Sequence, residues 1–340
     1  MMVVHRWDLP RGPASALLLV RLGEEHSVPA STVLHGTRVA VDDLEDPHAL
    51  VGAEQETRIV RNLLGALPTV EALPVLAGSR YHLTTHGVWG FAISGSPDLR
   101  SAIRVGLRYL ALTWAFCGMS VVEGGARSRL LLHSEHLPLD VRRFFVHREL
   151  ASIIAFAREL GLAEEQLPEV RLRDRPPADP GPRAKLLGPR VRFDAEEDAL
   201  VLDAAELDRP LPRADAHAAA LAEEQCRRLL EERYGRAGVA GLVRGHLMAA
   251  FPGVPDLEVV AGRLHVSSRT LRRRLVDEGT SYRVLLDEVR EGLAEELFAA
   301  GCTVEETGRR LGYRNTPSFT TAFKRWKGMA PRVYLARTRT

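Results

Sequence analysis

The sequence predicts an α+β amino-terminal domain followed by an all-α carboxy-terminal domain, which contains two helix-turn-helix units joined by a linker helix. The length of 340 residues is sufficient for two domains with separate cores. Apolar residues alternate with a period of two at 119–133, which indicates strands among segments of helical period. Beyond residue 257, an arrangement of two short helices occurs twice, with a long amphipathic stretch between the copies.

The amino-terminal domain, residues 1–235, is predicted to be mainly helical outside its strands. Apolar spacing and turn residues predict helices at 14–22, 29–34, 47–67, 98–116 and 138–160. The stretch 81–95 is rich in Gly and aromatic residues, so we expect irregular structure there.

The strands of this domain are short. Met119–Glu123 and Ser128–His133 flank Gly124-Gly125, a pattern typical of a tight β-hairpin. Further strands are expected at 170–173, 191–193 and 200–202, with the Pro-rich segment 175–189 as a loop within the sheet. A helix at 214–234 ends the domain, and its small and apolar residues suit either a dimer contact or packing on its own domain.

The second domain, residues 236–340, is placed after a loose stretch around Gly235–Gly238 and begins with a helix at 239–251. Its first helix-turn-helix unit starts with apolar residues at helical spacing: Leu257, Val260, Ala261 and Leu264. His265 and Val266 form the break, and Ser267 is a typical N-cap for the next helix. In that second helix Leu271 and Leu275 face inward, whereas four arginines lie on other faces. An ordinary helical hairpin with a solvated basic face is the alternative interpretation.

The second unit repeats this arrangement and favours the first interpretation. Its first helix is marked by Val304, Thr307 and Leu311, and Gly312-Tyr313 forms the turn. Thr316 is expected to cap the next helix, with Pro317 at the first helical position and with an apolar face of Phe319, Phe323 and Trp326. The continuous helix at 281–301 between the units is roughly 30 Å long. That is close to the ~34 Å between successive major-groove faces of B-DNA.

Charge is distributed unevenly between the two domains. Residues 236–340 contain 18 Lys and Arg and 11 Asp and Glu, a net charge of +7, whereas the rest of the chain has a net charge of −5. This asymmetry favours nucleic acid as the partner of the second domain and argues against it for the first.

Leu257–Leu275 (LEVVAGRLHVSSRTLRRRL) and Leu311–Tyr334 (LGYRN through FKRWKGMAPRVY) closely resemble the DNA-binding domain of the AraC family of transcription regulators. In that family Ile-Ala or Val-Ala usually stands where this chain has Thr307-Gly308, and Ser commonly stands where it has Pro317. Residues 90–104 and 188–212 are similar to an "arabinose-binding-type" domain of the same family, found in ornithine and arginine catabolism regulators. The second resemblance covers about 28–234 and implies a sensor or dimerisation domain whose ligand need not be a sugar.

The predicted DNA contacts lie on the second helix of each unit. In the first unit they are the residues away from the Leu271 and Leu275 face: Ser268, Arg269, Arg272, Arg273 and Val276. In the second unit they are Asn315, Thr316, Ser318, Thr320, Thr321, Lys324 and Arg325. Threonine cannot make the bidentate contact that arginine makes with guanine. We therefore expect the second unit to bind the DNA backbone, chiefly through Lys324, Arg325 and Lys327.

An effector pocket is expected between the hairpin and the helices that cover it, near Trp89, Phe91 and Trp114. These aromatic residues could equally be plain core. The pairs His82/His86 and His133/His136 have spacings that metal ligands can use, but no carboxylate is placed convincingly beside the first pair, and we interpret them as ordinary partly buried or surface residues. Cys117 is expected at an apolar helix end, in the core.

The three cysteines are far apart, which argues against a disulfide framework or a zinc site, and no catalytic or nucleotide-binding fingerprint occurs. No stretch approaches the ~18 apolar residues of a membrane span. The combined expectation is a cytoplasmic transcription regulator, not an enzyme, with no metal and no cofactor. Its partners would be double-stranded DNA, a small-molecule effector, a second copy in a homodimer, and RNA polymerase if it activates. The alternative is a DNA-binding regulator whose amino-terminal domain is a protein-interaction module without a ligand.

Overall fold

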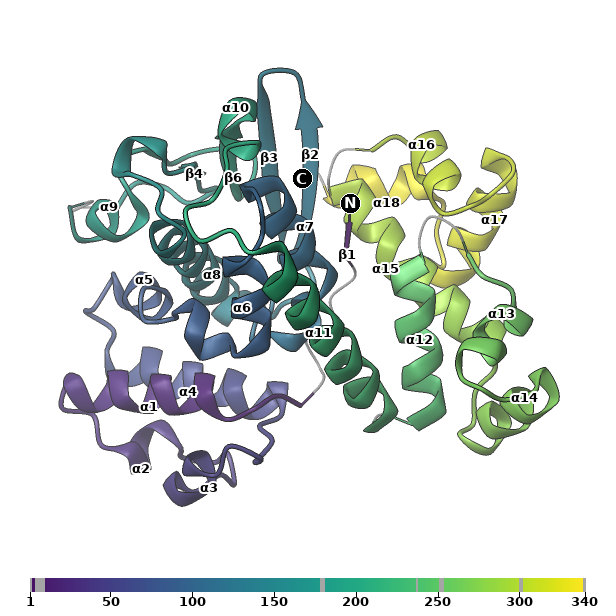
Figure 1. Cartoon of the computed structure of the whole chain (residues 1–340), viewed down its shortest axis with the longest axis horizontal. Helices are drawn as coiled ribbons and strands as arrows, with labels where there is room; N and C mark the ends of the chain where they lie inside the picture. The colour runs from purple at the N-terminus through teal and green to yellow at the C-terminus, as the bar shows by residue number, and fades with distance from the viewer. Residues whose placement is uncertain are drawn as a thin grey trace. The chain divides into compact units, whose positions relative to one another are not determined.

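Figure 1 shows a computed structural model of the chain, which describes residues 2–3, 10–177, 181–236, 238–250, 254–299 and 302–338. The chain divides into two compact units, Met1–Arg227 and Arg228–Thr340, and each is described by itself. The division falls within helix α11 (Ala216–Arg236), whereas the sequence places the boundary at residue 235, near the end of this helix.

A six-stranded sheet runs through the amino-terminal unit in the order β1-β2-β3-β6-β4-β5. Its strands are β1 Met2–Val3, β2 Gly118–Gly124, β3 Arg127–His133, β4 Glu169–Arg171, β5 Val191–Arg192 and β6 Ala199–Asp203. Neighbouring strands are antiparallel except β4 and β5. The predicted hairpin is confirmed, but Gly124 pairs with Arg127, so the turn is Gly125-Ala126. Gly125 has φ 59°, a left-handed conformation that glycine adopts at little cost.

The first part of this unit is helical, as expected. It consists of α1 Ala14–Glu25, α2 Ala30–Val33, α3 Val41–Glu45, α4 Ala53–Ala66 and α5 Leu73–Gly78. Its core includes the fully buried Leu19, Leu22, Ile59 and Leu63. The helix predicted at 47–67 begins only at Ala53, because the Gln55 side chain caps the chain there by accepting a hydrogen bond from Gly52 N at 2.7 Å. Helices α3 and α5 were not predicted.

Three helices cover one face of the sheet: α6 Val88–Ser94, α7 Leu99–Arg108 and α8 Leu139–Glu159 (Figure 1). The long helix predicted at 138–160 is confirmed as α8, which buries Phe144, Phe145, Leu150 and Ile154. The irregular structure predicted at 81–95 is wrong, because this stretch forms the 3₁₀ helix η1 (Leu83–His86) and then α6. Close packing explains the difference: at Gly90, α6 lies against the backbone of Leu83.

Two other predictions for this unit need correction. The helix expected at 98–116 ends earlier, at Arg108. A separate 3₁₀ helix, η2 (Leu110–Leu112), follows it, and the Thr113 hydroxyl donates to Leu110 O at 2.7 Å at its end. The segment 175–189, predicted as a loop, contains the helix α9 (Gly181–Leu187). The remaining short elements are η3 Glu164–Gln166 and α10 Ala204–Leu207.

The carboxy-terminal unit is all-α over its described residues. After the end of α11 it contains α12 Gly238–Ala250, α13 Leu257–Arg263, α14 Ser268–Asp277, α15 Tyr282–Ala299, α16 Val304–Arg310, α17 Thr316–Lys327 and α18 Pro331–Thr338. The helices predicted at 239–251 and 281–301 are thus confirmed as α12 and α15, and their predicted ends Phe251 and Gly301 lie outside the described residues. Of the stretch expected to be loose around Gly235–Gly238, Gly235 and Arg236 belong to α11 and Gly238 begins α12, whereas Ala237 lies outside the described residues.

Candidate DNA-binding surface and internal cavity

The first helix-turn-helix unit consists of α13 and α14. Val260 and Ala261 of α13 and Leu271 and Leu275 of α14 are almost fully buried, so the two helices share one small core. The turn between them places His265 at φ 54°. Ser267 is the N-cap of α14, as predicted, because its Oγ accepts a hydrogen bond from Thr270 N at 3.2 Å.

The outer face of α14 is exposed and basic. Arg269, Arg272, Arg273 and Val276 are exposed, and Ser268 is half-buried. Val276 is 67% exposed, which leaves a large apolar side chain in solvent. Arg272 lies 3.7 Å from Glu258, and both side chains are 67% exposed, so this weak ion pair leaves the guanidinium available. The structure therefore places all five residues that were predicted to contact DNA in the first unit on one helix, α14.

The second unit consists of α16 and α17. The prediction that Thr316 caps α17 is wrong. Asn315 is the N-cap, and its side chain accepts a hydrogen bond from Ser318 N at 2.9 Å. The helix therefore begins at Thr316, with Pro317 in its first turn. Phe319 and Phe323 are fully buried, and Trp326 is half-buried.

The outer face of α17 carries fewer free cations than the sequence suggested. Asn315, Ser318, Thr321, Lys324 and Arg325 are exposed, and Thr316 and Thr320 are half-buried. Arg325 pairs with Asp287 of α15 at 2.7 Å and keeps 52% of its side chain exposed. Lys327, expected to face solvent, instead pairs with Glu291 and Glu295 of α15 and is only 25% exposed. Lys324 is thus the cation best placed to contact DNA here.

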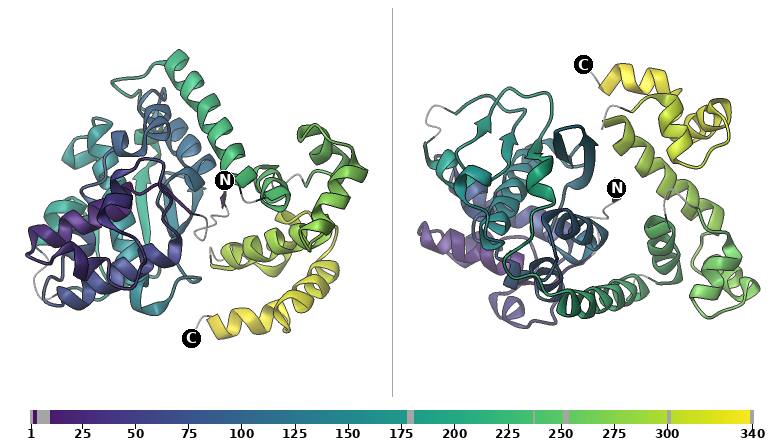
Figure 2. Two further views of the ribbon diagram at one scale, coloured as in Figure 1. Left: turned by 90° about the horizontal axis from the view of Figure 1, so that it is seen from below. Right: turned by 45° about the horizontal axis from the view of Figure 1, so that its top comes forward.

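The linker helix α15 connects the two helix-turn-helix units in the sequence and packs on α12, α16 and α17. It buries Leu285, Val289, Leu293 and Leu297. Figure 2 shows it running between the pair α13–α14 and the pair α16–α17. Its 18 residues correspond to roughly 27 Å of helix, close to the spacing of adjacent major-groove faces.

A carboxylate connects α12, which precedes the first helix-turn-helix unit, with the end of α14. Glu278, which follows α14 directly, accepts hydrogen bonds from Val239 N at 2.7 Å and Ala240 N at 2.8 Å. It therefore caps the start of α12 from another helix. Gly238 is required beside it, because its φ is +81° and an added Cβ would lie 2.9 Å from the Glu278 carboxylate.

Thr307 and Gly308, where the chain departs from the family pattern, both lie in the core of the second unit. A Cβ on Gly308 would lie 3.0 Å from Phe319 Cβ, so the glycine allows α16 and α17 to approach closely. Thr307 is fully buried, and its Oγ1 has no hydrogen-bond partner among the described residues. Such a hydroxyl destabilises the fold.

Replacing Thr307 by valine, which has the same shape without the hydroxyl, is expected to raise the free energy of unfolding by about 1 kcal/mol. Chemical denaturation of the full chain provides the measurement. Thr303→Val is the matched control: Thr303 Oγ1 accepts from Glu306 N at 3.2 Å and caps α16, so this change should cost about 1 kcal/mol. Destabilisation by both substitutions would contradict the inference that the Thr307 hydroxyl is buried without a hydrogen-bond partner and destabilises the fold.

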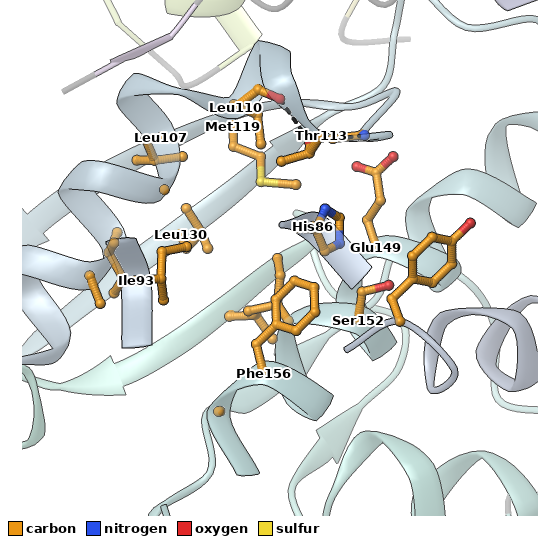
Figure 3. A pocket seen from close by; sticks show the side chains of 18 of the residues that line it. His86, Ile93, Leu107, Leu110, Thr113, Met119, Leu130, Glu149, Ser152 and Phe156 are labelled. Carbon is orange, nitrogen blue, oxygen red and sulfur yellow. Dashed lines mark hydrogen bonds between the residues drawn. The ribbon is translucent and has the colours of Figure 1, made fainter. Parts of the chain in front are cut away.

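The amino-terminal unit contains a cavity of about 130 Å³ between the sheet and α6, α7 and α8. The sheet contributes Met119 and Leu130 to its wall, and the helices contribute mostly aliphatic and aromatic side chains (Figure 3). Trp89 and Trp114 line it, as expected. Phe91 does not line it and is 65% exposed, because residues two apart on a helix point to nearly opposite sides.

His86 also lines the cavity, whereas the sequence indicated only that its spacing from His82 is one that metal ligands can use. Its ring lies 4.7 Å from Trp114, 4.9 Å from Trp89 and 5.2 Å from Phe156, measured between centroids. Both ring nitrogens are buried, and neither has a hydrogen-bond partner among the described residues. Burial, with the positive charge of Arg148 as the second cause, lowers the pKa of His86 to about 3, so the imidazole is neutral near pH 7.

Arg148 and Glu149, which line the cavity, belong to a buried network of ion pairs and hydrogen bonds. Arg148 Nη1 donates to Glu56 Oε1 at 2.8 Å, and both side chains are only 2% exposed. Glu149 Oε1 accepts from the backbone N of Phe116 at 2.5 Å and of Cys117 at 3.2 Å. Burial raises the pKa of Glu149, and Arg148 opposes this effect.

The other histidines and the cysteine selected from the sequence have ordinary structural roles. His82 pairs with Glu159 at 2.7 Å, and His133 lies 2.7 Å from Ser120 Oγ. Cys117 is buried, as expected, although it directly precedes β2 rather than lying at a helix end. Burial raises the pKa of its thiol well above the usual value, which makes it a poor nucleophile.

Two capped pairs of short helices, held by one linker helix and each presenting a polar face, define a helix-turn-helix DNA-binding protein. Comparison with known proteins agrees. A family model described as the arabinose-binding domain of AraC transcription regulators, N-terminal, matches residues 28–211, and a helix-turn-helix domain model matches residues 260–337. The chain belongs to the AraC family and is a DNA-binding transcription regulator.

The chain is similar over most of its length to other regulators. It is 37% identical to an uncharacterized HTH-type transcriptional regulator, Rv1395, of Mycobacterium tuberculosis, over 94% of each chain. It is 29% identical to the ornithine utilization regulator of Pseudomonas aeruginosa, over 94% of this chain and 95% of that one. The crystal structure of the transcriptional regulator CdpR from Pseudomonas aeruginosa matches 83% of this chain and 98% of that one, with 25% identity and a TM-score of 0.38. Among the helices that the structure describes, none combines the length and apolar character needed to span a bilayer.

Proposed function

We propose that this transcription regulator responds to a small molecule bound in the cavity of its amino-terminal unit. The cavity itself is the main support, because protein interiors are close-packed and hold few voids larger than a water molecule. About 130 Å³ between the sheet and three helices exceeds ordinary packing defects. Its walls are apolar and aromatic with a few polar groups, which is typical of small-molecule sites.

The ligand would act by preferring one arrangement of the protein over another. It can shift that equilibrium only by the difference in its affinities for the two arrangements. Helices α6, α7 and α8 all contribute to the wall, so a ligand that prefers one packing of these helices on the sheet would shift the protein towards that packing.

A cognate ligand at 100 times its dissociation constant is expected to stabilise the full chain by about 2.7 kcal/mol. It should also change the affinity for DNA with two half-sites by about 1–3 kcal/mol. A metabolite screen by thermal unfolding, followed by fluorescence anisotropy with labelled DNA, measures both effects. Ala102→Leu, which places a larger side chain at the buried cavity wall, should abolish them, whereas the same substitution at the exposed Ala218 should not.

If no metabolite changes the unfolding temperature or the DNA affinity, the sensing proposal is wrong. The amino-terminal unit would then be a protein-interaction module, most simply one that forms a homodimer. Helix α11 supports this second candidate, because Leu221 is 57% and Leu229 is 43% exposed on it. Two linked DNA-binding units would bind two half-sites with increased avidity.

The two helix-turn-helix units are proposed to contribute differently to DNA binding. Residues near the start of the second helix of such a unit contact base edges. Arg269 lies in the first turn of α14 and is exposed, so it can reach guanine O6 and N7. On α17 the exposed residues are mainly short and polar, and Lys324 is suited to phosphate. We therefore expect sequence to be read mainly by α14.

Arg269→Ala is expected to weaken binding to the specific site by roughly 1–3 kcal/mol and to relax the preference at one base step. Arg273→Ala should weaken binding to all sequences alike and reduce the salt slope by about one, because the lost contact is to phosphate. Anisotropy titrations at several salt concentrations, on a set of single-base variants, distinguish the two. Arg58→Ala, an exposed position of α4, is the control. Equal losses on every sequence for Arg269→Ala would refute the base contact.

A further inference from the structure

The polar side chains around the cavity are almost all engaged elsewhere. Thr113 Oγ1 donates to Leu110 O at 2.7 Å, and Ser152 Oγ donates to Arg148 O at 2.8 Å. These two hydroxyls therefore satisfy backbone carbonyls before any ligand arrives. A ligand that needed these hydroxyls as hydrogen-bond donors would first have to break these bonds.

The polar ends of the aromatic side chains are also used. Trp89 Nε1 donates to Gly106 O at 3.2 Å, and Trp114 Nε1 donates to Gly12 O at 2.9 Å. The Tyr81 hydroxyl lies 2.6 Å from Ser15 Oγ. These rings consequently present hydrocarbon surface to the cavity.

The charged side chains that line the cavity already have partners. Arg148 bonds Glu56, and it also donates to Trp114 O at 2.6 Å, while Glu149 accepts two backbone amides. A charged ligand would place a further charge beside this network, where the charged side chains that line the cavity are already paired and none is left to neutralise it. The desolvation cost of such a charge is large.

His86 is the exception among the polar side chains that line the cavity. Its Nδ1 and Nε2 are both buried without a hydrogen-bond partner among the described residues, in the midst of aromatic rings. A neutral imidazole can donate one hydrogen bond and accept another. Leaving both unmade costs stability, so the ring is prepared to meet a polar atom inside an apolar site.

We propose that the cavity binds a compact, uncharged and mainly apolar molecule with one hydroxyl-type group, which bonds to His86. This inference rests on the proposed sensing function and names the chemistry of its ligand. A hydroxyl is suited because it can both donate to and accept from an imidazole nitrogen. Figure 3 shows His86 with Phe156 beside it and with Met119 and Leu130 in the same site, so the rest of such a ligand would contact hydrocarbon.

The size of the cavity sets the size of the ligand. At about 130 Å³ it is comparable to engineered apolar cavities that bind benzene. A single aromatic ring or a short branched hydrocarbon therefore matches its volume. A sugar would bury several hydroxyl groups against walls whose own hydrogen-bond donors are mostly occupied. An amino acid such as ornithine would bury charges there as well.

Thermal unfolding of the full chain with five probes tests the proposal: phenol, toluene, benzoate, L-arabinose and L-ornithine. Phenol and toluene have nearly the same shape and differ in the hydroxyl group. We expect the largest upward shift in Tm with phenol, a smaller one with toluene, and none with the charged probes or the sugar. In isothermal titration phenol should bind at least about tenfold more tightly than toluene, about 1.4 kcal/mol of preference.

His86→Phe keeps an aromatic ring in place and removes the two nitrogens. This variant should bind toluene as the unmodified protein does and lose the preference for phenol. His48→Phe, at an exposed position, should leave the preference unchanged. The measured quantity is the preference for phenol over toluene. If His86 had only a structural role, its replacement would not remove this preference selectively.

The outcomes separate this inference from the proposed function. Equal binding of phenol and toluene to the unmodified protein would overturn the role of His86, while still supporting a ligand site. Stabilisation by L-arabinose or L-ornithine but not by phenol would overturn the ligand class and leave sensing intact. If none of the five probes binds and the metabolite screen is also negative, both the inference and the sensing function fail.

Discussion

Replacing Arg148 by methionine is expected to lower the free energy of unfolding of the amino-terminal unit by about 3–5 kcal/mol. Arg148 is fully buried and lies 2.8 Å from the equally buried Glu56, at 92 positions' separation in the chain. Removing the guanidinium leaves the Glu56 carboxylate without its counter-charge in the interior. Urea denaturation of the full chain, followed by far-UV circular dichroism, measures the loss.

Arg143→Met, on the same helix, is the matched control. Arg143 pairs with Asp174 at 2.7 Å, but its side chain is 56% exposed, so this change should cost less than about 1 kcal/mol. The double variant Glu56→Gln, Arg148→Met should recover part of the loss, because the buried charge is then absent. Similar stabilities of Arg148→Met and Arg143→Met would show that the buried pair does not stabilise the unit as inferred.

Gly90→Ala is expected to destabilise the amino-terminal unit by about 3 kcal/mol, at the upper end for overpacked sites. An added Cβ would lie 1.8 Å from Leu83 O, which is backbone and cannot move aside as a flexible side chain can. Helix α6 would have to separate from η1, and this would displace Trp89 and His86 from the cavity wall. Thermal unfolding and ligand titration together measure the effect.

Gly65→Ala is the control, because it is the same substitution in another helix with no atom within 4 Å of the added Cβ. It should stabilise the chain by roughly 0.5–1 kcal/mol, as alanine does relative to glycine inside a helix. If both variants have the stability of the unmodified protein, the close approach of α6 and η1 is not needed for folding.

The helix-turn-helix units could be predicted well because their signals are local. The Ser267 cap and the spacing of Leu271 and Leu275 lie within a few turns of one another, and the structure contains both. The N-cap of α17 was placed one residue late, because Asn315 and Thr316 are both good capping residues and the sequence alone does not decide between them.

Features that depend on distant parts of the chain could not be predicted. The pairs of Lys327 with Glu291 and Glu295 form only because α17 packs beside α15. Likewise Arg148 and Glu56 come from different helices and carry no sequence signal of their pairing. Of the aromatic residues expected at the pocket, Phe91 was misplaced because α6 itself was not predicted, and helical geometry then separates it from Trp89.

The Glu278 carboxylate has a consequence for backbone amide exchange. The first amides of a helix ordinarily exchange rapidly, because they have no partner within the helix. In α12 the amides of Val239 and Ala240 are instead bonded to a residue that directly follows α14. Their protection therefore depends on the end of α14 staying folded. Slow exchange at these two amides thus reports that α14 is intact, from a position that lies outside its own sequence.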